Sequence, residues 1–228
     1  MSDTKLRIAE IFTSLQGEGS LVGTPSTFIR VSGCNLRCSW CDTPYASHTP
    51  EGPVMEVTEI AEQVLSVNAA HVVITGGEPM IFGAVPELCR ILRVAGRHIT
   101  IETAGTSYYD LPCDLMSISP KLANSTPKGE QKTKHEDVRR NLEPLAQLTR
   151  RYACQFKFVV QCAADLVEID ALLRELPAHD HAIYLMAEGT DAELIRQRQR
   201  ELVRPCIERG WRLTPRMHID LFGNSRGT

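Results

Sequence analysis

Apolar, β-branched runs alternate with helical patterns along most of this chain, and this alternation limits the folds that it can adopt. Continuous apolar strands separated by helices are typical of a parallel sheet that helices cover. The predicted strands span residues 7–13, 28–32, 71–75, 98–102, 115–119, 156–161, 182–186 and 212–218. The predicted helices span residues 57–67, 85–95, 138–152, 164–176 and 191–209.

The length of the chain decides how far such a sheet can close. A complete eight-fold barrel usually needs roughly 250 residues, whereas this chain has 228 and holds about six strand–helix units. We therefore predict an α/β fold in one domain spanning residues 1–228, with a mostly parallel sheet that forms an incomplete barrel or stays open and curved. In both arrangements ligands bind at the carboxyl ends of the strands, so functional residues should follow strands.

Local signals mark where several elements begin and end. The Lys-rich segment 122–137 contains Pro127-Lys128-Gly129 and predicts a polar surface loop, with a lid over the site as the alternative. Pro144 predicts that the following helix starts late or is kinked. The pattern Thr190-x-x-Glu193 predicts a capping box for the last helix, which should end before Gly210.

The composition excludes several classes of protein. A net charge of −3 with 23% charged residues gives no basic excess for nucleic-acid binding. The polar start of the chain predicts no secretory signal, and no apolar run is long enough to span a membrane, so we expect a cytoplasmic protein. Eight cysteines without a signal suggest that some bind metal or take part in catalysis. Five of them lie among apolar residues and are interpreted as core thiols: Cys89, Cys113, Cys154, Cys162 and Cys206.

The other three cysteines lie close together after the strand predicted at 28–32. Cys34, Cys38 and Cys41 have a C-x3-C-x2-C spacing. Structural zinc sites and electron-transfer 4Fe–4S clusters normally have four protein ligands, so three thiolates would leave one iron open to a chelating small molecule. The alternatives are a zinc knuckle completed by His48 or His71, or three unrelated buried thiols.

Polar residues follow other predicted strands. The segment 75–79 (TGGEP) combines glycines that let a ligand approach the backbone with Glu78, a carboxylate that can accept from an ammonium group. The segments 102–105 (ETAG) and 119–121 (SPK) offer hydroxyls suited to a ribose or a carboxylate, and Gln161 ends another strand. Each of these segments alone is also compatible with a simple turn or cap.

Together the cysteine loop, the TGGEP segment and the polar strand ends resemble the radical S-adenosylmethionine superfamily. Further segments resemble the 7-carboxy-7-deazaguanine synthase family within it. They are residues 10–19 (EIFTSLQGEG), 28–30 (FIR), 41–43 (CDT), 119–121 (SPK), 215–218 (PRMH) and 222–224 (FGN). This resemblance covers nearly the whole chain and implies an incomplete (β/α)6-type barrel of the radical S-adenosylmethionine type.

The resemblance also implies a reaction. In this superfamily one electron from a 4Fe–4S cluster cleaves bound S-adenosylmethionine, and the resulting 5′-deoxyadenosyl radical abstracts a hydrogen atom from the substrate. In this family the enzyme is a lyase that converts 6-carboxy-5,6,7,8-tetrahydropterin to 7-carboxy-7-deazaguanine with release of ammonia, for queuosine-type 7-deazapurine biosynthesis. It implies Mg2+ as a further cofactor, a reductant such as flavodoxin or ferredoxin, and a homodimer, with no nucleic acid or membrane as partner.

Residue roles are carried over position by position. The cluster ligands would be Cys34, Cys38 and Cys41, and Thr43 would bind Mg2+. The contacts to S-adenosylmethionine would be Trp40, Asp42, Gly77, Glu78, Ser119, Pro120 and Lys121, and we add Gln161 because it ends a strand. The substrate contacts would be Leu15, Gln16, Gly17, Arg30 and Thr75. The C-terminal segment 212–228 would lie on the substrate side, with His218 facing the substrate from the last strand or serving as a structural histidine.

The residue types agree with these roles. Arg30 offers a bidentate fork for the substrate carboxylate, with a surface ion pair to Glu10 or Glu18 as the alternative. Exposed backbone at Gln16-Gly17 can recognise the edge of the pterin ring. Mg2+ prefers oxygen ligands, so the Thr43 hydroxyl suits it, although a helix cap or turn is the alternative for this residue.

Two other functions remain open. A glycyl-radical-enzyme activase shares the cysteine spacing, but the QGEG segment at 16–19 and the absence of a second cysteine cluster argue against it. A zinc-stabilised binding module without catalysis would also use clustered cysteines. Metal analysis after anaerobic purification would separate them, since a cluster contains about four irons with sulfide and a zinc knuckle contains one zinc.

Overall fold

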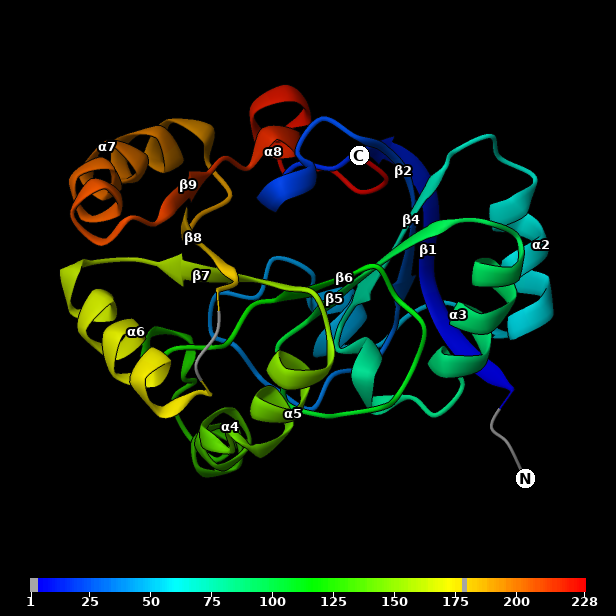
Figure 1. The fold of residues 1–228 in the computed structure, drawn as a ribbon, viewed down its shortest axis with the longest axis horizontal. Coiled ribbons are helices and arrows are strands. Elements are labelled where there is room, and N and C mark those ends of the chain that lie inside the picture. The colour runs from blue at the N-terminus through cyan, green and yellow to red at the C-terminus, as the bar shows by residue number, and fades with distance from the viewer. Residues whose placement is uncertain (1–3, 178–179) are drawn as a thin grey trace.

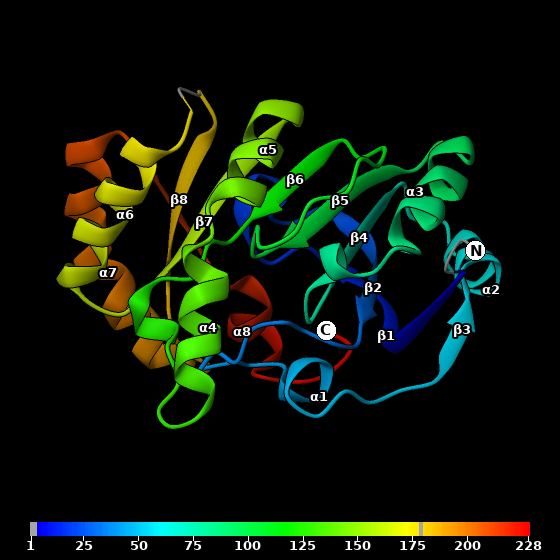
Figure 2. The same ribbon diagram turned by 90° about the horizontal axis from the view of Figure 1, so that it is seen from below.

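The computed structural model describes residues 4–177 and 180–228, which form a curved nine-stranded sheet with helices on its outer side (Figure 1). The predicted domain 1–228 also includes residues 1–3 and 178–179, which lie outside the described residues. The strand order is β3-β1-β2-β4-β5-β6-β7-β8-β9. Figure 2, turned by 90°, shows the helices following one another along the outside of this sheet.

The strands are β1 (Lys5–Leu15), β2 (Pro25–Val31), β3 (Val54–Glu56), β4 (His71–Gly76), β5 (His98–Thr103), β6 (Leu115–Ile118), β7 (Cys154–Val160), β8 (Ala182–Ala187) and β9 (Arg212–Thr214). The α-helices are α1 (Pro44–Ser47), α2 (Val57–Leu65), α3 (Val85–Val94), α4 (Gln131–Arg140), α5 (Glu143–Arg151), α6 (Ala163–Glu175), α7 (Ala192–Arg209) and α8 (Met217–Phe222). Three short 3-10 turns are η1 (Gly19–Leu21), η2 (Pro79–Ile81) and η3 (Ala123–Ser125).

The sheet is mostly parallel and does not close. From β2 through β4 to β9 each strand runs parallel to the next, whereas β1 pairs antiparallel with both β2 and β3. Helix α8 lies in the gap between the two ends of the arc (Figure 1), where the Met217 N–H donates to the Gly17 carbonyl at 3.0 Å. The predicted α/β fold with an open, mostly parallel curved sheet is therefore confirmed.

Strand β7 shows how the sheet separates the core from the site. All seven of its residues are buried, because helices cover one face and the other face lines the concave side. Phe156, Phe158 and Val160 belong to the apolar core under the helices, whereas Lys157 and Val159 face a cavity. Side chains point to alternate faces along a strand, so every second residue of β7 faces the concave side and a polar residue at such a position can reach the cavity.

The Lys-rich segment 122–137 is not one loop, contrary to the prediction. It contains η3 and the first two turns of α4, which continues to Arg140. Only His135 of α4 is buried, so the helix has no apolar periodicity by which to recognise it. The predicted helix 138–152 is divided between α4 and α5, and Pro144 lies in the first turn of α5, as its late start predicted.

Two further predictions at the C-terminal end of the chain were wrong in detail. The predicted strand 212–218 ends at Thr214, because Pro215 has no N–H to donate and helix α8 begins two residues later. The N-cap of α7 is Asp191, whose side chain accepts from the Leu194 N–H at 2.8 Å, in place of the predicted Thr190 box. Gly210 ends α7 in the left-handed conformation, as expected.

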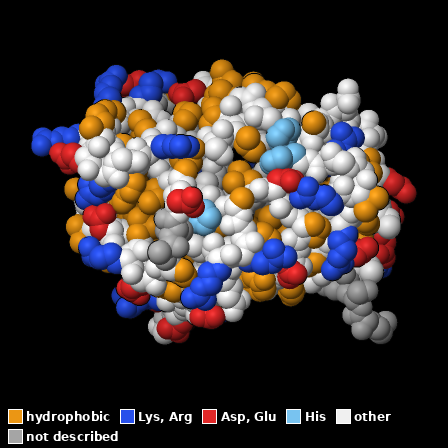
Figure 3. Space-filling model, in the orientation of Figure 1, with side chains coloured by type: hydrophobic (Ala, Val, Ile, Leu, Met, Phe, Trp, Pro, Cys, Tyr) orange, Lys and Arg blue, Asp and Glu red, His pale blue; other side chains and the backbone are white. Residues whose placement is uncertain are grey.

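No described helix is long and apolar enough to cross a membrane. On the face shown in Figure 3, Lys and Arg side chains are interspersed with Asp and Glu and do not gather into a basic stripe.

Candidate active site

A cavity of about 730 Å³ lies inside the curve of the sheet and opens at the carboxyl ends of the strands. Strands β1, β2, β4, β5, β6, β7 and β8 all contribute residues to its wall, as do the loops that follow them and the C-terminal segment after β9. Its volume is in the range of sites that bury a drug-sized ligand. The ligand-binding position expected for a parallel sheet is therefore present.

The three cysteines line this cavity from the loop that follows β2. The Leu36 N–H donates to Cys34 Sγ at 3.4 Å, and Ser47 Oγ lies 3.0 Å from Cys41 Sγ. Three thiols that face one cavity from one loop, with hydrogen-bond partners beside them, fit a cluster in which each sulfur binds its own iron. Among the described residues, no three His, Cys, Asp or Glu side chains are grouped to hold a single metal ion.

Burial keeps two of these thiols protonated in the absence of metal. Burial, together with Glu78, raises the pKa of Cys34 to about 12. Burial also raises the pKa of Cys38 to about 11, against the opposing effect of Lys121. Because metal ligation requires thiolates, cluster assembly must displace these protons.

The TGGEP segment holds the cysteine loop from the neighbouring strand. The Gly77 N–H donates to the Val31 carbonyl at 3.1 Å, and the Glu78 N–H donates to the Gly33 carbonyl at 2.9 Å. A Cβ on Gly77 would lie 2.1 Å from the Gly33 oxygen, so a side chain cannot fit between the two loops. Gly77 lines the cavity next to the cysteines.

Glu78 does not present its carboxylate to the cavity, contrary to the expectation that it would accept from a ligand ammonium. Its side chain is fully buried and accepts from Thr103 Oγ1 at 2.7 Å, from the Ala104 N–H at 2.7 Å and from the Met80 N–H at 3.0 Å. Burial raises the pKa of Glu78, and these hydrogen bonds oppose that rise. The carboxylate therefore fastens the TGGEP segment to the end of β5.

The SPK segment contributes two of its three residues. Lys121 Nζ donates to the Ser119 carbonyl and hydroxyl, each at 2.8 Å, and lies 5.8 Å from the centre of the Trp40 ring. Ser119, Lys121 and Trp40 line the cavity, whereas Pro120 is buried and is not part of the wall. Lys121 thus offers a positive charge beside the cysteine loop.

Gln161 lies outside the cavity, and its prediction as a cofactor contact is not supported by its position. It lines a separate pocket of about 90 Å³ between α6 and α7. Strand β7 ends one residue earlier, and the Gln161 N–H donates to the Asp165 carboxylate at 2.6 Å as the chain turns into α6.

Arg30 also lines the cavity, from β2. Its Nε donates to Glu10 Oε1 at 2.8 Å, so the ion pair considered as its alternative role is present. The guanidinium lies 5.7 Å from the centre of the Phe12 ring, which stacks on Phe28. Tyr45 donates to the same Glu10 carboxylate. The cavity wall around Arg30 therefore combines a flat aromatic surface with a positioned cation, which suits a planar ring bearing a carboxylate.

The backbone of Gln16 is not exposed, contrary to the prediction that it could recognise a ligand edge. Its N–H donates to the Thr24 carbonyl at 3.0 Å, and its carbonyl accepts from the Gly23 N–H at 2.8 Å. Gln16 is buried, and its Nε2 donates to Ser26 Oγ at 2.9 Å. Leu15, Gln16 and Gly17 nevertheless line the cavity, as do Thr75 and Asp42.

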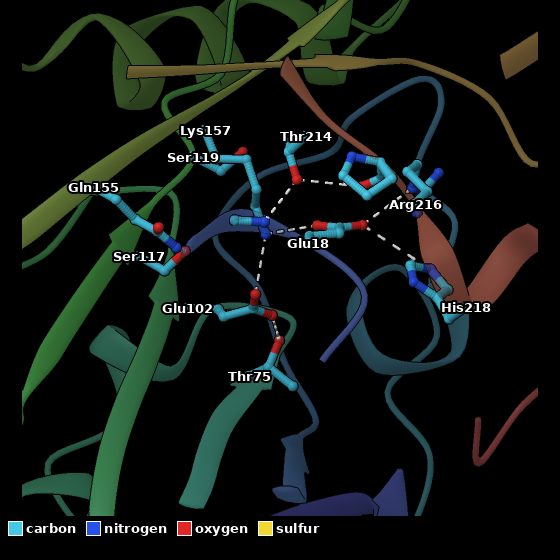
Figure 4. A network of polar contacts seen from close by, with 12 residues as sticks. Glu18, Thr75, Glu102, Ser117, Ser119, Gln155, Lys157, Thr214, Arg216 and His218 are labelled. Carbon is cyan, nitrogen blue, oxygen red and sulfur yellow. Dashed lines mark hydrogen bonds and ion pairs between the residues drawn. The ribbon is translucent and has the colours of Figure 1, made fainter. Parts of the chain in front are cut away.

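A network of charged groups crosses the middle of the cavity (Figure 4). Lys157 Nζ donates to Glu18 Oε2 at 2.6 Å and to Glu102 Oε1 at 3.0 Å. Thr75 Oγ1 donates to the other oxygen of Glu102 at 2.9 Å, and Arg216 Nε donates to the other oxygen of Glu18 at 3.1 Å. Five strands or loops far apart in the sequence are joined here through two carboxylates.

The charges in this network fix one another's protonation. Burial alone would raise the pKa of Glu18, but Lys157 and then Arg216 outweigh it and lower that pKa far below its ordinary value. Burial alone would lower the pKa of Lys157, but Glu102 and Glu18 outweigh it and raise that pKa. Glu18 is therefore a carboxylate and Lys157 an ammonium over the whole neutral range.

Residues after β9 close the network. Arg216 also pairs with Asp42, which follows the cysteine loop directly. His218 lies on α8 and not on a strand as predicted, with its Nε2 4.0 Å from Glu18 Oε1. Burial lowers the pKa of His218 and Glu18 opposes that effect, so the ring stays neutral near pH 7.

Thr43 lies at the N-cap position of α1 and lines the cavity, with its hydroxyl 3.9 Å from Cys41 Sγ. Its hydroxyl makes no capping hydrogen bond, so the alternative role as a side-chain cap does not occupy it. At the rim of the cavity the Arg226 guanidinium lies 3.6 Å from the centre of the Tyr45 ring and 3.1 Å from Glu51.

Comparisons with known proteins agree with this geometry. Residues 28–143 match the model of the radical SAM superfamily. A 7-carboxy-7-deazaguanine synthase of Rhodopirellula baltica is 45% identical over the whole of this chain and 90% of its own length. A second, from Halobacterium salinarum, is 42% identical over 98% of this chain and 93% of its own length. This chain belongs to the 7-carboxy-7-deazaguanine synthase family. It is accordingly an enzyme of the lyase class, and its superfamily uses a 4Fe–4S cluster with S-adenosylmethionine.

A solved structure extends the likeness to the fold of this family. The crystal structure of QueE from Escherichia coli superposes with a TM-score of 0.72 at 26% identity, covering 93% of this chain and 94% of that one. The site residues that the synthase resemblance suggested line one cavity, apart from Glu78 and Pro120.

Among the charged residues of the network, Glu18, Lys157 and Arg216 line the cavity but were not predicted as site residues. A lysine in the otherwise apolar run QFKFVV was the signal for Lys157, since an unpaired lysine does not enter a buried strand. Glu18 and Arg216 lie within quoted segments but were not assigned to the site.

Proposed function

We propose that this chain converts 6-carboxy-5,6,7,8-tetrahydropterin to 7-carboxy-7-deazaguanine with release of ammonia, as a step in queuosine-type 7-deazapurine biosynthesis. One observation carries the proposal. A single cavity is lined by three thiols and by an arginine beside an aromatic wall, in a chain that matches named 7-carboxy-7-deazaguanine synthases over its full length. The thiols suit a cluster and its cofactor, and the wall around Arg30 suits a flat heterocyclic acid.

Cys34, Cys38 and Cys41 hold the 4Fe–4S cluster. S-Adenosylmethionine contacts five residues that line the cavity: Trp40, Asp42, Gly77, Ser119 and Lys121. When bound, the cluster and S-adenosylmethionine supply hydrogen-atom abstraction from the substrate. Asp42 is kept in place by Arg216, and Lys121 by Ser119, so both charges are positioned before the cofactor arrives.

The substrate carboxylate faces Arg30, whose Nε is held in place by its ion pair with Glu10. The substrate ring contacts Leu15, Gln16, Gly17, Thr75 and His218, which surround this part of the cavity. The C-terminal segment 212–228 forms the substrate-side wall, since Arg216, His218 and Arg226 all line it. Because these groups come from separate loops, substrate orientation depends on how α8 packs against the loop after β1.

Mg2+ binds at Thr43, next to the substrate carboxylate, with waters completing its shell. The Thr43 hydroxyl is not used for capping, and Thr43 lines the cavity. Replacing Thr43 with Val keeps the shape of the side chain and removes its oxygen. We expect turnover by Thr43→Val to need about 10-fold more Mg2+ or more, because metal affinity falls when an oxygen ligand is lost.

A Mg2+ titration of product formation measures this effect. Thr49→Val, on an exposed residue of the same loop region, should respond to Mg2+ as the unmodified protein does. An unchanged Mg2+ requirement for Thr43→Val would show that the hydroxyl is not a ligand.

The partners follow from the same proposal. The enzyme is a cytoplasmic homodimer reduced by flavodoxin or ferredoxin, and a reducing compartment suits a protein whose cluster thiols must stay free. The substrate is a small molecule, so the reaction requires neither nucleic acid nor a membrane. The activase and zinc-module alternatives are not favoured by any contact in the cavity.

A turnover assay tests the proposed function. The reconstituted protein is incubated without oxygen with S-adenosylmethionine, a strong reductant, Mg2+ and 6-carboxytetrahydropterin, and the products are read by mass spectrometry. We expect 7-carboxy-7-deazaguanine. Formation of 5′-deoxyadenosine without that product would refute the substrate assignment, and the absence of both from protein with an intact cluster would refute the proposed chemistry.

A further inference from the structure

A row of polar side chains crosses the concave face of the sheet at the level of the cavity. Arg30 of β2 pairs in register with Thr75 of β4, and Glu102 of β5 pairs with Ser117 of β6, which pairs in turn with Gln155 of β7. The register between β4 and β5 continues the row from Thr75 to Glu102. Neighbouring strands lie about 4.8 Å apart, so a flat ligand that lies along this row meets its side chains one after another.

The orientation of the Gln155 amide is fixed by a backbone donor. Its Oε1 accepts from the Ser20 N–H at 2.9 Å, so its Nε2 points the other way and donates to Ser117 Oγ at 2.9 Å. Gln155 and Ser117 lie side by side (Figure 4). Since a backbone N–H can only donate, turning the amide over would lose the contact with Ser20. The amide is buried, and a Cβ on Gly19 would lie 2.4 Å from its Nε2, so the loop after β1 packs closely against it.

The Ser117 hydroxyl is therefore held as a donor. Because Gln155 Nε2 occupies one lone pair of the Ser117 oxygen, the hydroxyl proton points away from Gln155. In the described part of the chain no protein group accepts this proton. Ser117 is only 1% exposed because it lies at the bottom of the cavity, but it lines the cavity wall, whereas Met116 and Ile118 on either side of it belong to the core. The proton is available to a ligand that reaches the bottom of the cavity.

Glu102 supplies the complementary group beside this donor. Its oxygens accept from Lys157 and Thr75, but each carboxylate oxygen can accept more than one hydrogen bond, and the side chain is partly exposed and lines the cavity. A carboxylate acceptor next to a hydroxyl donor matches a ring edge in which an N–H group adjoins a carbonyl. The 4-oxo pyrimidine ring of a pterin has this cyclic-amide edge.

We propose that Ser117 determines substrate specificity by donating a hydrogen bond to the ring carbonyl of the pterin, and that Gln155 is the positioning residue that keeps the hydroxyl directed toward it. This inference rests on the proposed function, since it names the part of the substrate that this row recognises. With the substrate carboxylate on Arg30, the ring extends along the row toward Glu102 and Ser117. An amino group in place of the carbonyl would bring a second donor against the Ser117 donor, so the row selects the 4-oxo ring.

The test compares two affinities, measured by calorimetry without oxygen: one for 6-carboxytetrahydropterin and one for its analogue with a 4-amino group. The reconstituted protein contains the cluster, S-adenosylmethionine and Mg2+ but no reductant, so no turnover occurs. We expect the unmodified protein to bind the 4-oxo compound about 100-fold more tightly or better. Ser117→Ala should weaken binding of the 4-oxo compound about 10-fold and leave that of the 4-amino compound unchanged, so the ratio of the two affinities falls about 10-fold.

Three further variants separate this role from a purely structural one. Ser117→Thr keeps the hydroxyl on a side chain suited to a strand and should retain the unmodified ratio. Gln155→Met keeps the length of the side chain but removes the amide that directs the hydroxyl, so the ratio should fall. Thr100→Val is the matched control, because Thr100 is buried on the same face of β5 as Glu102 but does not line the cavity. It should change neither affinity.

A general loss of cavity shape would weaken both compounds together, whereas the proposal requires the ratio to change. An unchanged ratio in Ser117→Ala would overturn the proposal, and so would an equal change in Thr100→Val. A protein that shows the expected ratios but makes no 7-carboxy-7-deazaguanine would refute the proposed reaction and leave this inference standing. A protein that makes the product while Ser117→Ala keeps the full ratio would do the reverse, and failure to bind the pterin at all would refute both.

Discussion

Replacing Cys38 with Ala is expected to abolish the cluster signal and to lower turnover by more than about a thousandfold. The reason is that Cys38 is one of only three thiols on the loop that lines the cavity, and no other described Cys, His, Asp or Glu group is arranged to replace it in a single-metal site. The fold should survive, since the substitution removes one sulfur atom and costs about 1 kcal/mol of unfolding free energy. Iron analysis, the electron paramagnetic resonance signal of the reduced cluster and product formation together measure the result.

Cys206→Ala is the matched control for this experiment. Cys206 is buried to a similar degree as Cys38 but lies on α7, away from the cavity wall. We expect it to bind about four irons and to turn over normally. If the two variants retained iron and activity equally, the assignment of Cys38 to the cluster would be wrong.

The part of the site that the sequence predicted correctly consists of groups whose neighbours lie close in the chain. Cys34, Cys38 and Cys41 share one loop, so their meeting depends only on a short turn after β2. Gly77 and Ser119 follow strands, and parallel strands bring their carboxyl ends to one edge. Apolar, β-branched runs separated by helical patterns were sufficient to place these strands, because the buried strands of a parallel sheet are nearly continuous apolar runs.

The charged network could not be predicted in the same way. Glu18 and Lys157 are 139 positions apart, and Glu18 and Arg216 are 198 apart. Their pairing depends on the curvature of the sheet and on α8 filling the gap between its ends, and neither is encoded in local periodicity. The burial of His135 was hidden for a similar reason, because a helix with one inward side chain looks like a polar loop.

The two errors at strand ends have a common cause. Gln161 was placed at the site because it was expected to end a strand, but β7 stops at Val160 and the chain turns away into α6. Glu78 was read as a ligand group by residue type, but three nearby donors use its carboxylate. The type of a residue and its position in a strand predict where its side chain points only if the strand continues to that residue. They also require that no closer hydrogen-bond partner is available to the side chain.

Replacing Lys157 with Met is expected to destabilise the protein by about 3–5 kcal/mol at neutral pH, because it leaves two carboxylates without the cation that they share. The Lys157 side chain is 6% exposed, Glu18 14% and Glu102 32%, so solvent cannot fully replace the lost charge. For a chain of this length the melting temperature should fall by roughly 10 °C. Product formation should fall as well, since Lys157 anchors the loop that carries Glu18 and, through Glu102, the end of β4 that carries Thr75. Thermal and urea unfolding, with a turnover assay on the folded fraction, measure both effects.

The pH dependence of this loss has a definite sign. Lys157 is the largest favourable charge lowering the pKa of Glu18 in the folded protein. A lowered carboxylate pKa contributes stability that is present above the unfolded pKa of about 4.3 and is lost as pH falls through the folded value. Lys157→Met removes this contribution, so the difference in stability between it and the unmodified protein should be largest above about pH 5 and should shrink as the solution becomes more acid.

Lys5→Met is the matched control, because Lys5 also lies on a strand and pairs with a glutamate, at 3.1 Å from Glu56, but is 59% exposed. An exposed pair of this kind contributes at most about 1 kcal/mol, so its removal should hardly change the unfolding free energy. In the double variant Glu18→Gln with Lys157→Met, one uncompensated carboxylate is gone, and the loss should be smaller than the sum of the two single losses. Additive losses, or a Lys157→Met protein as stable as Lys5→Met at neutral pH, would show that the network does not hold the two sides of the cavity together.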